Sequence, residues 1–407
     1  MLRKDHHSRA RTWRVTSTHT AERACVLVIA ATWVWGGTLP AQLGIAWAQK
    51  SSPAARSDSM WRSVGSTKDV RESSGLVLLN DGRVLVAGGH RDPQWKLIGS
   101  AELYDPSSET WSPTGDLVEP REGVGALTLL ANGKVLLAGE HTTETGAELY
   151  DTATGKWSAT GALLTGRGGH STTLLQDRKV LVAGGIDYDA PGTPIFASAE
   201  LYDPATETWS ATGEMIGKRF KHGGVRLPNG QVLVAGGTAT EPSDDRALAT
   251  AELYDPASGK WAQTGALSRS REGPVMVLLR DGKVLIAGGA AGNFGNYTTL
   301  AEAEIYDPQT GTWTATAPMT QDRVGFTLTL LSDGRVLSAA GVTRPKNTAL
   351  SSAEIYDPAT GTWTDAGTMN ARRWNHRAVL LPNGSVLIVG GFNVTGQLRY
   401  SEVFTLK

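Results

Sequence analysis

The stretch from Gln231 to Trp261 decides the fold: it reads QVLVAGG over residues 231–237 and, after a loop, AELYDPASGKW over residues 251–261. Both phrases recur along the chain with small variations. The first covers residues 82–89, 133–140, 178–185, 230–237, 282–289, 334–341 and 384–391, and the second covers residues 101–111, 147–157, 199–209, 251–261, 303–313 and 353–363. Self-similarity of this kind predicts a chain built from equivalent structural units.

A tryptophan marks each unit and fixes the period. The repeat-position tryptophans are Trp61, Trp111, Trp157, Trp209, Trp261, Trp313 and Trp363. Their spacings are 50, 46, 52, 52, 52 and 50 residues. Each unit is therefore long enough for several strands.

The unit that begins near Arg219 predicts four strands. Residues 220–227 read as an extended stretch, and Asn229-Gly230 supplies the positive φ that a tight hairpin turn needs. Residues 231–235 are almost all apolar, as expected of a strand covered on both faces. Residues 252–254 form a third strand, and residues 260–262 a fourth after an Asp-Pro turn. We interpret Tyr254 and Trp261 as packing residues between neighbouring units.

The two ends of the chain complement each other. The first three strands occur seven times, and the seventh set ends at Ser401–Phe404 with no tryptophan strand after it. Residues 60–62, around Trp61, precede the first set and have no partners of their own. The N-terminal strand is therefore predicted to complete the last unit and to close a ring without a free edge.

A period near fifty with a double glycine, a tyrosine and a tryptophan resembles the kelch repeat. The resemblance covers nearly everything from residue 59 to the C-terminus. It implies an all-β, seven-bladed kelch β-propeller with four antiparallel strands per blade, the last blade closed by the strand around Trp61. It implies little about function, because propellers host enzymes, receptors and scaffolds alike.

The N-terminal segment predicts export. Six basic residues lie within residues 1–23, an apolar run covers residues 24–35, and Ala46-Trp47-Ala48 fits a signal-peptidase site. The run is short for a membrane-spanning helix of about 20 residues, although an uncleaved anchor is the main alternative. We therefore expect a signal peptide over 1–48, a linker over 49–58 and a propeller over 59–407. The predicted location is the periplasm or the extracellular space, with no membrane attachment after cleavage.

Charge and cysteine content exclude several classes of function. The full chain has 39 basic and 40 acidic residues, and removing six basic and two acidic residues with the leader leaves 33 and 38. This balance gives no electrostatic case for nucleic-acid binding. The only cysteine, Cys25, lies in the predicted leader, so the mature protein has no disulfide. We expect a monomer that binds a protein or a glycan.

Variable loops point to one face of the propeller as the binding face. The connections from strand two to three and from strand four to one share a face and vary in sequence, whereas the other face carries uniform short turns. An arginine precedes every first strand: Arg71, Arg121, Arg167, Arg219, Arg271, Arg323 and Arg373. These arginines could form an anion-binding funnel. Alternatively, each could tie its blade to the next through a glutamate or a backbone carbonyl.

Histidines and aromatic residues near the same face are further ligand-binding candidates. His170, His222 and His376 share one register, where other units have Ser74, Pro274 and Phe326. Three such histidines could hold a metal, but two lie in adjacent blades and one across the ring, so we expect no metal and no other cofactor. Trp374 and Phe220 could stack on a planar ligand or simply line the channel. Asp187 to Asp189 and Asp244-Asp245 are weaker calcium candidates.

Two functions remain open. The pattern is similar to the central propeller of galactose oxidase, but that resemblance implies a copper cofactor with a Tyr–Cys crosslink, and the mature chain has no cysteine. We therefore expect no catalytic residue and interpret the protein as a non-catalytic recognition or scaffold module. The alternative is a carbohydrate-active enzyme, such as one similar to the sialic acid epimerases, that uses the arginine funnel.

Overall fold

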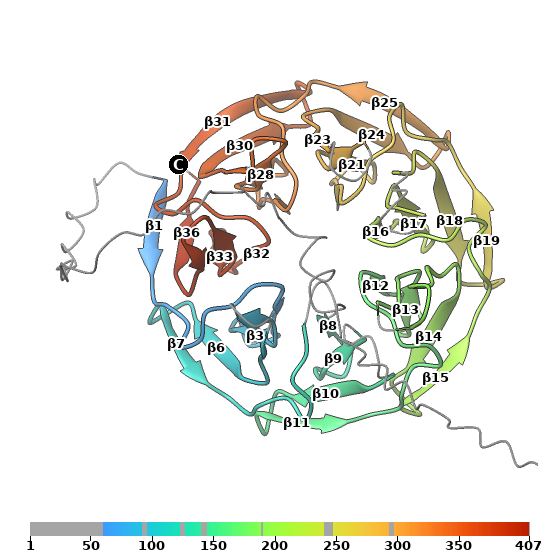
Figure 1. The fold of residues 1–407 in the computed structure, drawn as a ribbon, viewed down its shortest axis with the longest axis horizontal. Helices are drawn as coiled ribbons and strands as arrows, with labels where there is room; N and C mark the ends of the chain where they lie inside the picture. The colour runs from blue at the N-terminus through green and yellow to red at the C-terminus, as the bar shows by residue number, and fades with distance from the viewer. Residues whose placement is uncertain are drawn as a thin grey trace, which may run out of the picture. The chain divides into compact units, whose positions relative to one another are not determined.

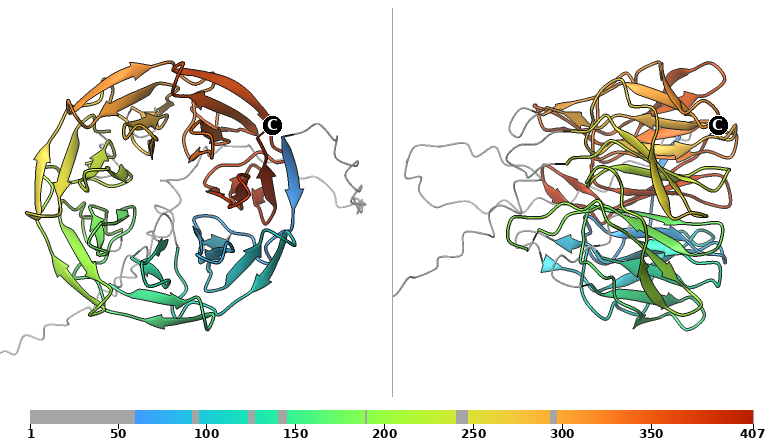
Figure 2. Two further views of the ribbon diagram at one scale, coloured as in Figure 1. Left: turned by 180° about the vertical axis from the view of Figure 1, so that it is seen from behind. Right: turned by 90° about the vertical axis from the view of Figure 1, so that its right-hand side faces the viewer.

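The computed structural model describes residues 60–91, 96–122, 127–139, 145–188, 190–239, 247–292 and 297–406. These residues form seven four-stranded antiparallel sheets arranged as blades around one axis, as Figures 1 and 2 show. The predicted all-β, seven-bladed propeller is confirmed. The predicted leader (1–48) and linker (49–58) lie outside the described residues. In the part that is described, no helix has the length and apolar character to cross a membrane.

Each blade uses its strands in the same order from the axis outwards, except that the last blade takes its outer strand from the N-terminus. Blades 1–7 begin with the inner strands β2 (Gly75–Leu78), β8 (Leu127–Leu129), β12 (Ser171–Leu174), β16 (Gly223–Arg226), β20 (Val275–Leu278), β26 (Thr327–Leu330) and β32 (Arg377–Leu380). The second strands are β3 (Val84–Ala87), β9 (Val135–Ala138), β13 (Val180–Ala183), β17 (Val232–Ala235), β21 (Val284–Ala287), β27 (Val336–Ala339) and β33 (Val386–Val389). The third strands are β6 (Ala101–Asp105), β10 (Ala147–Asp151), β14 (Ala199–Asp203), β18 (Ala251–Asp255), β24 (Ala303–Asp307), β30 (Ser352–Asp357) and β36 (Ser401–Phe404). The outer strands are β7 (Thr110–Pro113), β11 (Lys156–Ala159), β15 (Thr208–Ala211), β19 (Lys260–Gln263), β25 (Thr312–Thr316), β31 (Thr362–Thr368) and β1 (Trp61–Val64).

The ring closes as the sequence predicts. Strand β1 pairs with β36 in antiparallel register, with Trp61 opposite Phe404, and the two rings lie 5.1 Å apart. Figure 1 shows β1 (blue) beside β36 (red) at the edge of the ring. Trp61 also donates a hydrogen bond from Nε1 to the carbonyl of Ala366 in blade 6. Blade 7 therefore joins the two ends of the chain.

The core lies between blades because the second strands are buried on both faces. Val232–Ala235 in β17 are fully buried, as the near-continuous apolar run predicts. In blades 3–6 the tyrosine and the tryptophan each add an inter-blade hydrogen bond. In blade 4, Tyr254 shares a hydrogen bond with Thr212, and the Trp261 indole N–H donates to the carbonyl of Gly213, both in the connection from blade 3. The predicted packing role of Tyr254 and Trp261 is confirmed.

The double glycine after each second strand lets neighbouring blades approach closely. Gly236 and Gly237 have φ values of +69° and +91°. A Cβ on Gly236 would lie 2.7 Å from the carbonyl oxygen of Arg271 in blade 5, and one on Gly237 would lie 2.6 Å from the carbonyl oxygen of Phe220. Gly237 then donates its N–H to Arg271 O at 2.9 Å, so the glycines join adjacent blades.

The connections divide between two faces. We call the face with the strand two-to-three and four-to-one connections the loop face, and the opposite one the hairpin face. On the loop face, the described residues show a short extra hairpin in four of the two-to-three connections, which the sequence did not reveal. These hairpins pair β4 (His90–Arg91) with β5 (Lys96–Leu97), β22 (Ala290–Ala291) with β23 (Thr298–Thr299), β28 (Val342–Thr343) with β29 (Thr348–Ala349), and β34 (Phe392–Asn393) with β35 (Gly396–Gln397).

Candidate functional site

The seven arginines predicted as a funnel have buried and paired side chains. In blade 4, Arg219 Nη2 lies 2.6 Å from Glu252 Oε1, and Nη1 donates to the carbonyls of Gly236 and Thr250. The same ion pair recurs in every blade: Arg71–Glu102, Arg121–Glu148, Arg167–Glu200, Arg219–Glu252, Arg271–Glu304, Arg323–Glu354 and Arg373–Glu402. No arginine side chain in the set is more than 2% exposed.

The arginine side chain ties strands of its own blade rather than joining two blades. Its glutamate comes from the third strand of the same sheet, which corrects the expectation that a partner lies in the next blade. The link between blades uses the arginine backbone instead, because in six of the seven cases its carbonyl accepts the N–H of a glycine in the preceding blade. A role in ligand binding stays a prediction for these residues, and a ligand would have to displace the glutamate to reach the guanidinium.

The three same-register histidines lie against the preceding blade. His222 Nε2 is 2.9 Å from Ser171 Oγ in blade 3, and His376 Nε2 is 3.0 Å from Thr327 Oγ1 in blade 6. Burial, together with the charge of Arg167, lowers the pKa of His170 to about 3. The pKa of His222 and that of His376 also lie well below 6.5, chiefly because of burial. All three imidazoles are therefore neutral at neutral pH.

The two aromatic candidates are covered by other rings. Trp374 is 4% exposed and its ring meets that of Phe392 edge-on at 4.8 Å. Phe220 is 2% exposed and packs edge-on against Tyr188 at 6.4 Å. Both residues directly follow an entrance arginine, and both lie in a bridge to the residue after the glycine pair of their own blade. In this structure their faces serve as packing surfaces.

A buried His–Glu cluster on the loop face escaped the sequence analysis. His90 is fully buried, with Nδ1 3.0 Å from Glu122 Oε1 in the connection into blade 2 and Nε2 3.5 Å from Glu72 Oε2 in its own blade. Burial alone would lower the pKa of His90, but hydrogen bonds and charges from Glu122 and Glu72 outweigh it and raise the pKa to about 9. His90 is therefore a cation at neutral pH, unlike the three histidines above.

This cluster could have been found by comparing equivalent positions. Glu72 directly follows an entrance arginine and His90 directly follows a glycine pair, and these two positions pair across as a bridge. The corresponding pairs in other blades are Gly168–Ile186, Phe220–Thr238, Glu272–Ala290, Val324–Val342 and Trp374–Phe392. The position therefore differs from blade to blade, so the histidines in the His170 register are not the only break in symmetry.

Side chains two residues after the entrance arginine join neighbouring blades around the axis. Lys221 Nζ in blade 4 lies 2.7 Å from Glu272 Oε1 in blade 5, and Asn375 Nδ2 in blade 7 donates to Glu72 Oε1 in blade 1 at 2.9 Å. Lys221 and Asn375 have φ values of +51° and +52°. Charged and polar side chains near the axis are thus paired across blades in blades 4–5 and 7–1.

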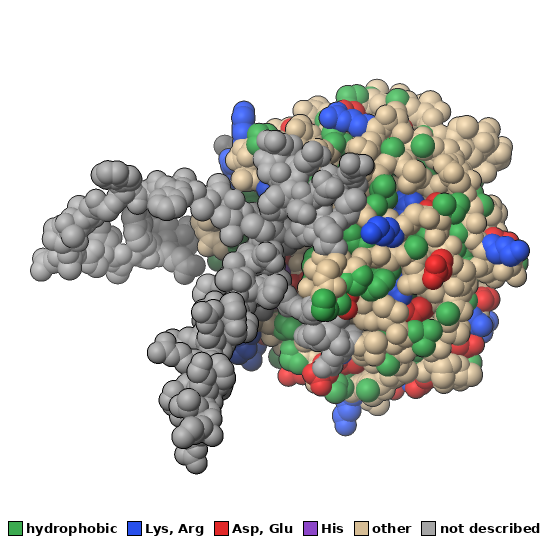
Figure 3. Space-filling view, turned by 45° about the vertical axis from the view of Figure 1, so that its right-hand side comes forward, with side chains coloured by type: hydrophobic (Ala, Val, Ile, Leu, Met, Phe, Trp, Pro, Cys, Tyr) green, Lys and Arg blue, Asp and Glu red, His purple; other side chains and the backbone are tan. Residues whose placement is uncertain are grey.

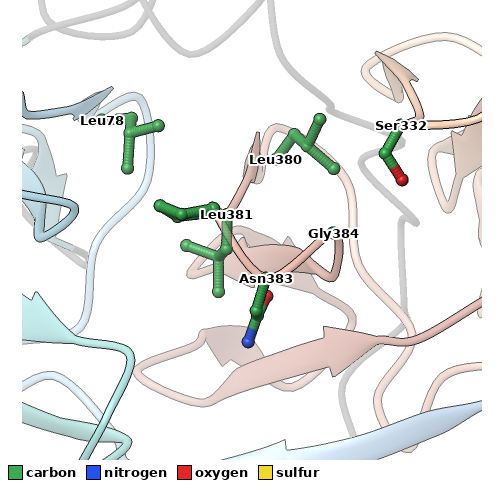
Figure 4. A pocket seen from close by; sticks show the side chains of 7 residues that line it. Leu78, Ser332, Leu380, Leu381, Asn383 and Gly384 are labelled. Carbon is green, nitrogen blue, oxygen red and sulfur yellow. The ribbon is translucent and has the colours of Figure 1, made fainter.

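A pocket lies on the hairpin face, away from these clusters. It has a volume of about 430 Å³ and is open to solvent between turns of blades 6, 7 and 1. Its lining residues, most of them labelled in Figure 4, are Leu78, Ser332, Leu380, Leu381, Pro382, Asn383 and Gly384. None of these side chains titrates, so the pocket offers packing surface and a few hydrogen bonds but no acid–base chemistry.

Of the acidic candidates for a cation, Asp187 is the one that the structure describes. Within the ranges described above, no group of three or more His, Cys, Asp or Glu side chains could hold a metal ion. Asp187 accepts a hydrogen bond from the backbone N–H of Ala190, which is an ordinary loop interaction. The remaining calcium candidates, Asp189 and Asp244-Asp245, lie outside the described residues.

Comparison with known proteins supports the repeat assignment. The family model described as "Kelch motif" matches residues 77–117, 277–320 and 329–370. The chain is 27% identical to human Kelch-like protein 34 over 161 residues, and 24% identical to alpha-scruin of Limulus polyphemus over 254 residues. These alignments cover 39% and 61% of this chain but only 23% and 22% of the relatives, so the chain spans under a quarter of their length.

A solved structure shows the same fold at greater coverage. It is described as a "Novel fungal alcohol oxidase with catalytic diversity among the AA5 family, in complex with copper" and superposes with a TM-score of 0.68. The match covers 85% of this chain and 76% of that one, at 17% sequence identity, which supports the fold alone. Seven blades with matching glycine, tyrosine and tryptophan positions, the motif matches and these relatives together support kelch repeats folded as a β-propeller.

Proposed function

We propose that this protein is a non-catalytic recognition module that binds a protein partner through its loop face. The observation that carries the proposal is the location of its exposed apolar side chains. Among the described residues, the large hydrophobic side chains that stand out into solvent are Val118, Leu164, Ile216, Val394 and Tyr400. All five lie in strand two-to-three or four-to-one connections. Apolar side chains gathered on one face favour a protein interface.

The alternative of a carbohydrate-active enzyme loses its main support. It relied on free arginines, and all seven guanidinium groups are buried against glutamates. Trp374 and Phe220, the aromatic candidates for stacking on a sugar, are buried as well. On the face seen in Figure 3, Lys and Arg side chains are interspersed with Asp and Glu, so this view shows no basic patch for an acidic sugar. We therefore prefer a protein ligand to a glycan.

Site-specific photo-crosslinking tests which face is used. A photoreactive amino acid would replace Val394 on the loop face, Asn383 on the hairpin face, or Asp365 on an outer strand, in the full-length protein expressed in its native host. We expect the Val394 site to yield a crosslinked protein that the other two do not. A partner captured only from Asn383 would contradict the proposal. Glycan-array binding or a stoichiometric metal in the purified protein would instead favour the enzyme.

We also propose that the protein works outside the cytoplasm. The proposal relies on the basic segment, the apolar run and the Ala46-Trp47-Ala48 site in the N-terminal sequence. N-terminal sequencing of protein from each cell fraction is the test. We expect exported material that begins near Gln49, whereas exported protein that still begins at Met1 would indicate an uncleaved anchor.

A further inference from the structure

An arc of exposed aliphatic side chains crosses three consecutive blades on the loop face. Val118, Leu164 and Ile216 are 53%, 58% and 67% exposed. They lie in the connections into blades 2, 3 and 4, each at the third residue before the entrance arginine. The arc therefore consists of one position repeated in neighbouring blades rather than of scattered apolar residues.

The same hydrogen bond holds every residue of this position in place. The backbone N–H groups of Val118, Leu164 and Ile216 donate to Oε2 of Glu148, Glu200 and Glu252 at 2.8, 2.7 and 2.6 Å. In the other four blades, Lys68, Ser268, Thr320 and Asn370 make the equivalent bond at 2.8, 2.9, 2.7 and 2.6 Å. Of the seven equivalent positions, three in consecutive blades are thus aliphatic, and the four in the remaining consecutive blades are polar.

The aliphatic side chains of the arc are not needed for packing. The residue directly before each of them, Leu117, Leu163 or Met215, is only 6%, 3% or 4% exposed and belongs to an inter-blade core. In each of these connections, therefore, one residue packs inwards and the next one faces solvent. A partner that covers such exposed aliphatic groups gains free energy of binding, because it removes apolar surface from water.

Charges around the arc indicate the chemistry of that partner. The same three connections expose Asp116, Glu119 and Glu214 but only one cation, Lys218, since their arginines are ion-paired. The connections into blades 7 and 1 instead expose Arg372 and Lys68, while the exposed Arg269 before blade 5 is paired with Glu302. The surroundings of the arc are therefore acidic, and a segment that covers it gains from Lys or Arg beside its apolar side chains.

We infer that the arc of Val118, Leu164 and Ile216 is the docking surface for a polypeptide segment that presents aliphatic side chains flanked by basic residues. This inference deepens the proposed function and rests on it. Aliphatic groups of the segment cover the three side chains, and its cations lie near Asp116, Glu119 and Glu214. The arc is the part of the loop face that selects the partner.

The test uses a random peptide library displayed on phage and selected against the full-length protein. The enriched peptides are synthesised, and their dissociation constants are measured by fluorescence anisotropy. An arc variant carries Val118→Ser, Leu164→Ser and Ile216→Ser, and a matched control carries Ser268→Ala, Thr320→Ala and Asn370→Ala at the equivalent positions. Both sets are at solvent-facing sites held by backbone bonds, so the variants should fold as the wild type does.

We expect enriched peptides with aliphatic and basic residues that bind the arc variant at least about tenfold more weakly. The control should bind them within about twofold of the wild type. Asp116→Asn, Glu119→Gln and Glu214→Gln together should weaken binding at low salt more than at high salt, because screening removes the attraction.

Five outcomes would overturn the inference, and they distinguish it from the proposed function. Peptides that bind the arc variant normally but lose affinity on Val394→Ser and Tyr400→Ser would leave the loop face as the interface and exclude the arc. Peptides affected only by Asn383→Lys on the hairpin face, or no enrichment at all, would contradict both proposals. Enriched acidic peptides would refute the partner chemistry. Sedimentation showing a wild-type dimer and a monomeric arc variant would assign the arc to a second copy instead.

Discussion

The buried arginines and the variable residues of the arc position lie three residues apart in the chain, yet one type of residue recurs in all seven blades and the other changes from blade to blade. In each blade one glutamate holds both: Oε1 takes the arginine side chain and Oε2 takes the backbone N–H of the variable residue. The first bond requires a specific side chain, so arginine recurs seven times. The second bond requires only a backbone, so valine, serine and lysine all fit. A repeat can therefore keep its geometry while its surface changes.

The largest expected effect comes from removing the strand that closes the ring. Deleting residues 60–64 should lower the free energy of unfolding by about 4 kcal/mol or more, because loss of a buried tryptophan alone costs about 3–5 kcal/mol. The deletion also leaves β36 without its outer neighbour. Urea unfolding of the full-length chain measures the change. Deleting residues 54–58 instead is the control, and equal effects of the two deletions would contradict the role of β1.

The next effect concerns the buried ion pairs. Arg219→Ala should cost about 3 kcal/mol, because it leaves the Glu252 carboxylate buried without its charged partner. Arg271→Ala and Arg373→Ala should cost similar amounts, since their environments are equivalent. Thermal and urea unfolding provide the measurement.

Arg269→Ala is the matched control, because Arg269 lies two residues from Arg271 and is exposed. Its replacement should change stability by less than about 0.5 kcal/mol. Unchanged stability in all three variants of the buried arginines would instead restore the anion-binding interpretation.

The His90 cluster predicts a loss of stability on the alkaline side. Its folded pKa of about 9 lies above the ordinary value of 6.5, so its contribution is complete below pH 6.5 and is lost as the pH rises through 9. A shift of this size corresponds to at most about 3 kcal/mol. Urea unfolding from about pH 6 to about pH 10 should show a declining free energy of unfolding for the wild type but not for His90→Gln. Parallel curves would exclude a charged His90.

The smallest effect sharpens the comparison between packing and exposed residues. Leu164→Ser should change the free energy of unfolding by less than about 0.5 kcal/mol, because the side chain is 58% exposed. Leu163→Ala, one residue earlier, should cost about 2–4 kcal/mol, because Leu163 is buried between blades. Similar costs for the two variants would show that Leu164 packs as well, and would weaken the case for a docking surface.

Sequence alone predicted the fold because the fold is a repeated pattern. The strand order, the positions of Tyr254 and Trp261 and the closing strand around Trp61 all follow from counting equivalent residues. Partner identity could not be obtained in this way. The sequence shows that Arg219 and Glu252 recur in every unit, but only the structure shows that they pair within one blade. The His90 cluster lies at positions that differ between blades, so no periodic signal marks it.

The pairing of Trp61 with Phe404 has a consequence for the order of events during synthesis. The ribosome makes the first outer strand before any other part of the propeller, and the strand it must join is made last. Blade 7 can therefore assemble only after β36 has been translated, and β1 stays without its neighbour until then. The propeller stays open until β36 has been made, so a chain terminated before Ser401 is left with an unpaired edge.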